Sequence, residues 1–211
     1  MKKLLSCFLS FTLIGALMMP QVFAGEINTY LEYSISFDNN KLSQKAYKES
    51  EDYMFPIREI SEVIGYKVDW SESDRTVTIT GNSKKAEFKI GENKYTIDDD
   101  MIFVSKLPSE IKNDSTYVSA GFLDNFLDIV IREPDNGTIS IMSIKKIEGI
   151  IEAASMTMLV LRADKGKKYS FNTEKTEGSS AGSLIIGSKV TVCYIDELEE
   201  NSINTALKIE Q

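Results

Sequence analysis

The spacing of apolar residues predicts two short helices and several short strands between residues 30 and 142. In the stretch 57–64, the apolar residues fall on one side of a helix with 3.6 residues per turn; they are Ile57, Ile60, Val63 and Ile64. Pro56 stands at the helix start, where its missing N–H costs nothing. Gly65 stands where a helix-ending glycine belongs. Residues 67–70 and 76–80 then read as two strands separated by a polar turn.

This pattern occurs twice. Residues 53–79 and 116–141 share the order strand, short helix, strand, turn, strand. Pro56 aligns with Ser119, Ile60 with Leu123, and Val77 with Ile139. A repeat of about 60 residues is too long for a solenoid and predicts two related halves of one domain. Between the halves, residues 86–97 read as a hairpin, and Asn136-Gly137 predicts a tight turn in the second half.

After Lys145 the pattern changes to strands alone. Five candidates follow one another, at 147–151, 156–161, 168–171, 188–195 and 203–209. Five short strands in about 65 residues are typical of a small closed or nearly closed barrel. We therefore predict an α+β fold. An antiparallel sheet with two short helices from the duplicated unit (27–143) is followed by a small five-stranded β-barrel domain (144–211).

The N-terminus has the three parts of a secretory signal. Lys2 and Lys3 precede an apolar run from Leu4 to Met19, and Val22 and Ala24 form a small-residue exit site. The run is shorter than the ~20 residues of a membrane-spanning helix, and no basic stop-transfer cluster follows it. We predict a signal peptide at 1–24 and a mature chain that is secreted, extracellular or in the cell wall, with no membrane insertion after cleavage.

Charge and composition limit the possible partners and chemistry. Loss of Lys2 and Lys3 takes the formal net charge from −8 to −10, so nucleic acid and anionic lipid are disfavoured partners. The chain has no histidine, which excludes Ser-His-Asp and Cys-His catalysis and histidine-ligated metals. Only Cys193 survives processing, and its alternating strand context predicts a half-buried packing residue rather than a reactive thiol. We predict no cofactor and no metal site.

One family shares these motifs. The first half combines Pro56-Ile57-Arg58, a helix ending at Gly65, Val68-x-Trp70, a polar turn and Thr76-Val77-x-Ile79. Residues 30–142 thereby resemble the stalk domain found at the N-terminus of some copper amine oxidases, which recurs in secreted and surface proteins of Gram-positive bacteria. The resemblance implies a non-catalytic domain. The second half departs from this pattern. It has Ser119, Gly121 and Glu133 at the positions of the proline, arginine and tryptophan of the first half.

Several residues are candidates for a site. Arg58, Tyr66 and Trp70 are a possible ligand surface for a glycan. The simpler expectation is that Trp70 packs the helix onto the sheet, while Arg58 either stacks over Trp70 or pairs with Glu62 one helical turn on. Asp98-Asp99-Asp100 and Asp38-Asn39-Asn40 contain possible calcium ligands, but each is expected to be a solvated turn. Asp124 and Asp128 lie one helical turn apart as the carboxylate pair of a conceivable hydrolase.

These observations together favour a secreted, non-catalytic cell-envelope module that acts as a spacer or binding domain. Its partner would be a cell-wall component or an exported protein. Two alternatives remain open: a carbohydrate- or peptidoglycan-binding module, and a carboxylate-dependent hydrolase. The sequence does not indicate the oligomeric state.

Overall fold

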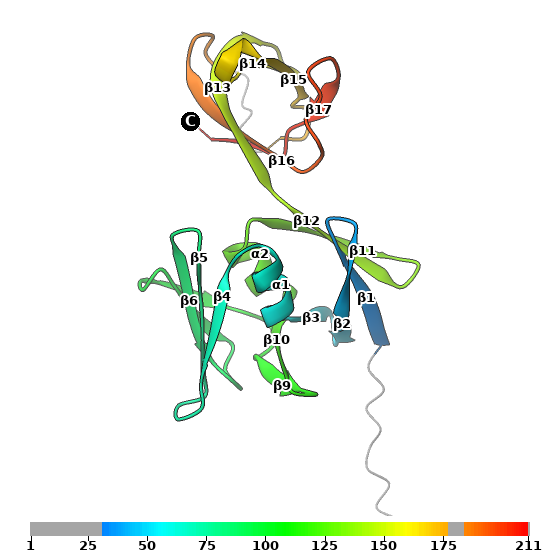
Figure 1. Cartoon of the computed structure of the whole chain (residues 1–211), viewed down its shortest axis with the longest axis vertical. Coiled ribbons are helices and arrows are strands. Elements are labelled where there is room, and N and C mark those ends of the chain that lie inside the picture. Colours follow the sequence, from blue (N-terminus) through cyan, green and yellow to red (C-terminus); the bar gives the residue numbers. More distant parts are fainter. Residues whose placement is uncertain (1–30, 177–183, 211) are drawn as a thin grey trace, which may run out of the picture.

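The structure is a computed structural model that describes residues 31–176 and 184–210. Figure 1 shows a larger lobe with both α-helices and a smaller lobe of strands at the C-terminal end. This arrangement confirms the α+β class. Within the described ranges, no helix is both long and apolar enough to cross a lipid bilayer. The predicted signal peptide at 1–24 lies outside the described residues.

The larger lobe contains a seven-stranded sheet in the order β11-β12-β1-β2-β3-β10-β9. All neighbours are antiparallel except β1 and β12, which are parallel. The strands are β1 (Leu31–Phe37), β2 (Asn40–Glu49), β3 (Asp52–Pro56), β9 (Glu110–Lys112), β10 (Ser115–Ser119), β11 (Ile129–Asp135) and β12 (Thr138–Ser143).

A second sheet of the same lobe is antiparallel, in the order β4-β5-β6-β7-β8. Its strands are β4 (Lys67–Ser71), β5 (Thr76–Gly81), β6 (Lys84–Lys89), β7 (Lys94–Ile97) and β8 (Met101–Val104). The prediction of one antiparallel sheet is therefore wrong, since the lobe has two sheets and one parallel pair. The chain passes from the second sheet to the first between Val104 and Glu110. Pro108 lies in this passage and cannot donate a ladder hydrogen bond, which favours a break there.

The duplicated unit is visible as β3-α1-β4-β5 and β10-α2-β11-β12, with α1 at Ile57–Val63 and α2 at Ala120–Phe126. Strands β3 and β10 pair antiparallel, and Phe55 lies opposite Val118. These two residues occupy the same position in the two units, because Pro56 aligns with Ser119. The halves are therefore related by a pseudo-twofold axis that passes between Phe55 and Val118.

Helix α1 buries one face and ends at a glycine. Ile57 and Ile60 are fully buried. Val63 is 53% exposed, so its predicted place on the buried face is wrong; it lies roughly 110° around the helix from the centre of that face. Gly65 ends the helix as predicted, with a φ of 86°. The Gly65 N–H donates to the Glu62 carbonyl (3.1 Å), and the Tyr66 N–H donates to the Ser61 carbonyl (2.9 Å). This is the Schellman pattern.

Aromatic side chains join α2 to the five-stranded sheet. Phe122 is fully buried, and its ring stacks on that of Tyr95 from β7 at 4.1 Å between centroids. On the same helix, Phe126 stacks on Phe122 at 5.5 Å. The two sheets and both helices thus share one hydrophobic core.

The smaller lobe is a six-stranded sheet in the order β17-β15-β14-β13-β16-β18. Its elements are β13 (Lys145–Ala154), β14 (Met158–Arg162), a 3-10 turn η1 (Asp164–Gly166), β15 (Lys168–Asn172), β16 (Lys189–Tyr194), β17 (Ile203–Thr205) and β18 (Lys208–Glu210). The prediction was a closed or nearly closed barrel of five strands. Among the described residues the sheet has six strands and is not a closed barrel, because its edge strands β17 and β18 do not pair with each other.

The last predicted strand, 203–209, changes partner halfway. Strand β17 pairs in parallel with β15, and β18 pairs antiparallel with β16. Between them the Ala206 N–H donates to the Asn172 carbonyl (3.2 Å) and the Leu207 N–H to the Cys193 carbonyl (2.8 Å). A single segment thereby lies along both edges of the sheet and covers them without closing the ladder.

One residue, Ile144, connects the lobes, since β12 ends at Ser143 and β13 begins at Lys145. The Ile144 N–H donates to the Asp128 carbonyl at 2.8 Å. Residues of both lobes, Asp128 and Cys193 among them, line a common cavity of about 440 Å³. The predicted domain boundary between 143 and 144 lies at this connection. Whether each lobe folds alone stays a prediction.

Candidate functional site: a groove beside Arg58 and Trp70

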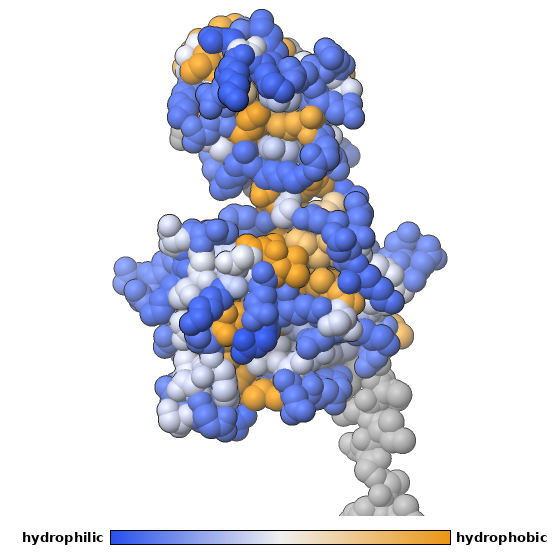
Figure 2. All heavy atoms as spheres, in the orientation of Figure 1, coloured by the Kyte–Doolittle hydropathy of each residue, from blue (hydrophilic) through white to orange (hydrophobic). Residues whose placement is uncertain are grey.

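A groove of about 250 Å³ opens beside α1. One wall comes from the first unit, through Arg58 and Trp70. The other comes from the β9–β10 hairpin, which leads into the second unit, through Ile111 and Asp114. Figure 2 shows hydrophobic residues at the surface of the larger lobe among hydrophilic ones. The groove therefore combines an aromatic ring, a guanidinium and a carboxylate.

Arg58 is held at the edge of strand β4. Its Nη1 donates to the Val68 carbonyl at 2.7 Å and to Glu62 Oε1 at 3.3 Å. The predicted pairing with Glu62 is thus present, but both side chains are 52% exposed, so it adds little stability. The bond to Val68 is the one that fixes the guanidinium beside Trp70.

Trp70 lies on β4 and is partly buried against the core of the larger lobe. Its Nε1 donates to Glu72 Oε2 at 2.8 Å, which fixes the plane of the ring. The ring also lines the groove. Trp70 therefore takes part both in packing and in the groove.

Tyr66 does not join this groove. Its side chain is only 3% exposed, and its ring contacts that of Phe126 at 5.4 Å. Burial raises the pKa of Tyr66 above its ordinary value. Of the three residues proposed as a ligand surface, the structure brings Arg58 and Trp70 together and places Tyr66 under α2.

Gln44 belongs to the groove but has no signal in the sequence. Its Nε2 donates to Ser115 Oγ at 2.8 Å, across 71 positions of chain. Its Oε1 is buried and has no hydrogen-bond partner among the described residues. The groove thus contains an acceptor whose hydrogen-bonding capacity is unmet.

Glu59 anchors the strand that carries Gln44 to α1. Its carboxylate accepts from Ser43 N–H (2.7 Å), the Ser43 hydroxyl (2.8 Å) and Gln44 N–H (2.9 Å). Desolvation raises the pKa of Glu59, but these hydrogen bonds outweigh it, so the pKa is lowered. The charged carboxylate thereby fixes the backbone of Gln44 beside the groove.

The second unit contains a corresponding groove of about 310 Å³. Its lining includes Gly121 and Glu133, the residues that align with Arg58 and Trp70, and Tyr53 from the other unit. The pseudo-twofold axis therefore relates two grooves with different chemistry. The first is lined by Arg58 and Trp70, whereas the second has Gly121 and Glu133 at these positions and is lined by Arg132 instead.

The candidate calcium segments are hairpin turns. Asp98 accepts from Lys85 N–H at 2.8 Å, and Asp99 pairs with Lys85 Nζ at 3.1 Å. Asp38 accepts from Ser143 N–H at 3.0 Å. Within the described ranges, no group of three or more acidic or cysteine side chains could hold a metal ion.

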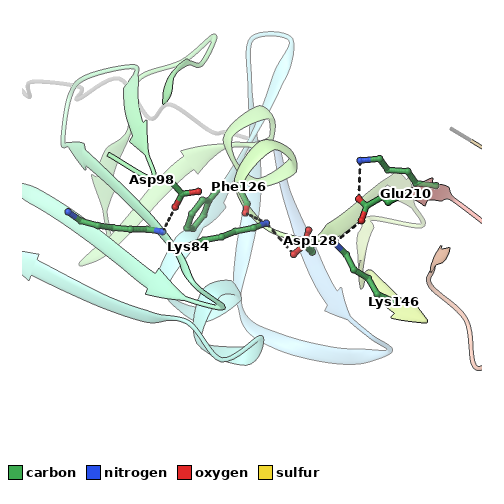
Figure 3. Close-up of polar contacts among 8 residues, drawn as sticks. Lys84, Asp98, Phe126, Asp128, Lys146 and Glu210 are labelled. Atoms are coloured by element: carbon green, nitrogen blue, oxygen red, sulfur yellow. Dashed lines mark hydrogen bonds and ion pairs between the residues drawn. The ribbon is translucent and has the colours of Figure 1, made fainter. Parts of the chain in front are cut away.

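The carboxylate pair Asp124 and Asp128 is not on one helix, because α2 ends at Phe126. Figure 3 shows Asp128 between Lys84 of the larger lobe and Lys146 of the smaller one. Asp128 Oδ2 pairs with Lys84 Nζ at 3.2 Å. The same Lys84 Nζ also donates to the Phe126 carbonyl at 3.3 Å. Asp128 therefore neutralises a lysine rather than forming the isolated acid of a hydrolase.

Cys193 is a packing residue and is more deeply buried than predicted, at 3% exposure. Burial raises the pKa of its thiol, and the Glu210 carboxylate raises it further. A raised pKa reduces the thiolate fraction at neutral pH, so the thiol is a poor nucleophile.

The fold and the groove define an α+β module without a recognisable catalytic constellation among its described residues. In a comparison with protein families, residues 36–141 match the copper amine oxidase N-terminal domain. The chain belongs to this family, whose domain is a non-catalytic part of such enzymes. No curated protein matches the chain.

The copper of the family's name does not fit the residues of this chain. Copper sites in proteins rely chiefly on imidazole and sulfur ligands. The chain has no histidine.

Proposed function

We propose that the mature chain is an exported, non-catalytic module of the cell envelope that acts as a spacer and as a binding domain. The family supports the non-catalytic character of residues 36–141. The basic, apolar and small-residue parts of 1–24 support export. The proposed location is the cell wall or the medium, and the proposed partner is a cell-wall component or an exported protein.

The one-residue connection between the lobes carries the spacer role. Flexible linkers between domains are longer and rich in glycine, serine or proline. Ile144 is a single residue whose N–H is bonded to Asp128. The thiol of Cys193 points away from the core of its own lobe yet is buried, and it lines the shared cavity. Such a braced junction holds the two lobes at one separation.

Export is tested by N-terminal sequencing of protein recovered separately from the medium and from the cell wall. We expect a first residue at or near Gly25. An intact Met1 would contradict export, and a lipid on Cys7 would show an anchored protein instead. Retention of the purified chain on isolated cell wall then separates binding from spacing, because a pure spacer passes through.

A further inference from the structure

We infer that the groove between Arg58 and Trp70 is a saccharide-binding site. This inference deepens the binding role proposed above by naming the class of ligand. It concerns the folded protein alone, so its test with purified protein is independent of whether export or spacing is confirmed.

The aromatic wall suits a sugar ring. One part of the Trp70 side chain packs against the hydrophobic core, and another part borders the groove. Its Nε1 is already engaged by Glu72, so the ring offers its apolar surface rather than its N–H. A fixed, flat, apolar surface is complementary to the C–H face of a pyranose, and little conformational entropy is lost on binding.

The polar groups of the groove suit sugar hydroxyls, each of which both donates and accepts. All hydrogen bonds of the Arg58 guanidinium in the described structure leave from Nη1, so Nη2 and Nε keep their donors. The carboxylate of Asp114 adds acceptors at the opposite wall. Gln44 also lines the groove, and its Oε1 is a further acceptor that has no hydrogen-bond partner among the residues the structure describes.

The size of the groove and the state of the β4 edge disfavour other ligands. A volume of about 250 Å³ lies below the range of roughly 300–1,000 Å³ that holds drug-sized molecules and cofactors, and suits one ring of a longer chain. An added peptide strand would need the free backbone groups of β4. The Val68 carbonyl on β4 is already taken by Arg58 at 2.7 Å. The groove therefore favours a saccharide over an extended peptide.

The groove of the second unit provides an internal control. Glu133 occupies the position of Trp70, and Gly121 occupies the position of Arg58. The backbone surroundings are equivalent by pseudo-symmetry, but no tryptophan lines this groove. Its arginine, Arg132, and its aromatic ring, Tyr53, stand at positions that do not correspond to Arg58 and Trp70. Replacing Glu133 should leave saccharide binding unchanged, although it alters the charge of an equivalent surface.

The test uses the mature chain, residues 25–211, on a glycan array and on purified peptidoglycan. It is followed by titration with chitotetraose, cellotetraose and maltotetraose. Trp70 is the only tryptophan, so its emission reports directly on the groove. We expect retention by at least one probe, with a blue shift and reduced acrylamide quenching. R58A and W70A should weaken binding at least tenfold, and E133A less than twofold.

Two results would overturn the inference. The first is that the wild-type chain binds nothing on the array, is not retained by peptidoglycan, and shows no shift of Trp70 emission with any of the three oligosaccharides. This result does not depend on the folding of any variant. The other is binding that E133A weakens as much as R58A does. Circular dichroism of each variant shows whether it is folded, and R58K is the second variant if R58A is not. R58K should weaken binding at least threefold, because a lysine cannot reproduce the guanidinium fork.

Discussion

Substitution of Trp70 by alanine measures how much of this side chain serves the core. Truncating a fully buried tryptophan costs about 3–5 kcal/mol. Trp70 is only partly buried and borders an open groove, so solvent enters the vacated space and no sealed cavity remains. We therefore expect W70A to lower the free energy of unfolding of the larger lobe by about 2–3 kcal/mol.

Urea unfolding followed by hydrogen exchange and mass spectrometry resolves the two lobes in one experiment. Exchange protection should fall in β4, β5 and α1 and stay unchanged in β13 to β16, because the two lobes have separate hydrophobic cores. W70F keeps an aromatic ring and should lose less than half as much stability. A loss below 1 kcal/mol, or an equal loss of protection in both lobes, would refute this reading of Trp70.

Three further perturbations test the local structure. G65A should destabilise the protein by about 1–2 kcal/mol, because φ is 86° at Gly65. G121A in α2, where φ is not positive, should be neutral or stabilise the protein by up to about 1 kcal/mol, and thermal melting compares the two variants. E59Q should cost about 2 kcal/mol at pH 7, because the amide cannot accept three hydrogen bonds as the carboxylate does. The difference from wild type should vanish as pH falls through the lowered pKa of Glu59, since the carboxylate's contribution exists only above it. Burial raises the pKa of Tyr95 to about 12. The stabilisation that comes from this raised pKa is complete below pH 10 and is lost as pH rises from 10 to 12. Over that interval the free energy of unfolding of Y95F should therefore fall by about 3 kcal/mol less than that of the wild type.

Local patterns were sufficient to predict much of the larger lobe. The helix end depends on Gly65 and two carbonyls within four residues, and the Asn136-Gly137 turn depends on two positive φ values that these residue types favour. The repeat alignment placed Phe55 and Val118 at equivalent positions, and these two pair directly. Structural features that depend only on residues close in the chain can therefore be predicted from a single sequence.

Features that depend on distant residues were not predictable. The alternation in 203–209 is the same whichever strand lies beside it, so the change of partner at Ala206 leaves no local trace. Gln44 reaches Ser115 only after the two units pair. Tyr66 stands four positions from Trp70, but it belongs to the turn after α1 and packs against Phe126. Closeness in the sequence therefore suggested that Tyr66 and Trp70 share a surface, whereas in the fold they lie at different places.

The spacer role is tested most directly by the distribution of distances between the lobes. Exposed Ser73 in the larger lobe and exposed Asn201 in the smaller one can carry spin labels as cysteines. Cys193 is buried and lines the junction, so it is left in place. A pair within the larger lobe, at Ser73 and Lys106, gives the width expected for a rigid body. We predict one inter-lobe distance with a distribution about as narrow as that control. A broad distribution or several separate distances would show lobes that move independently, and would contradict a spacer of fixed length.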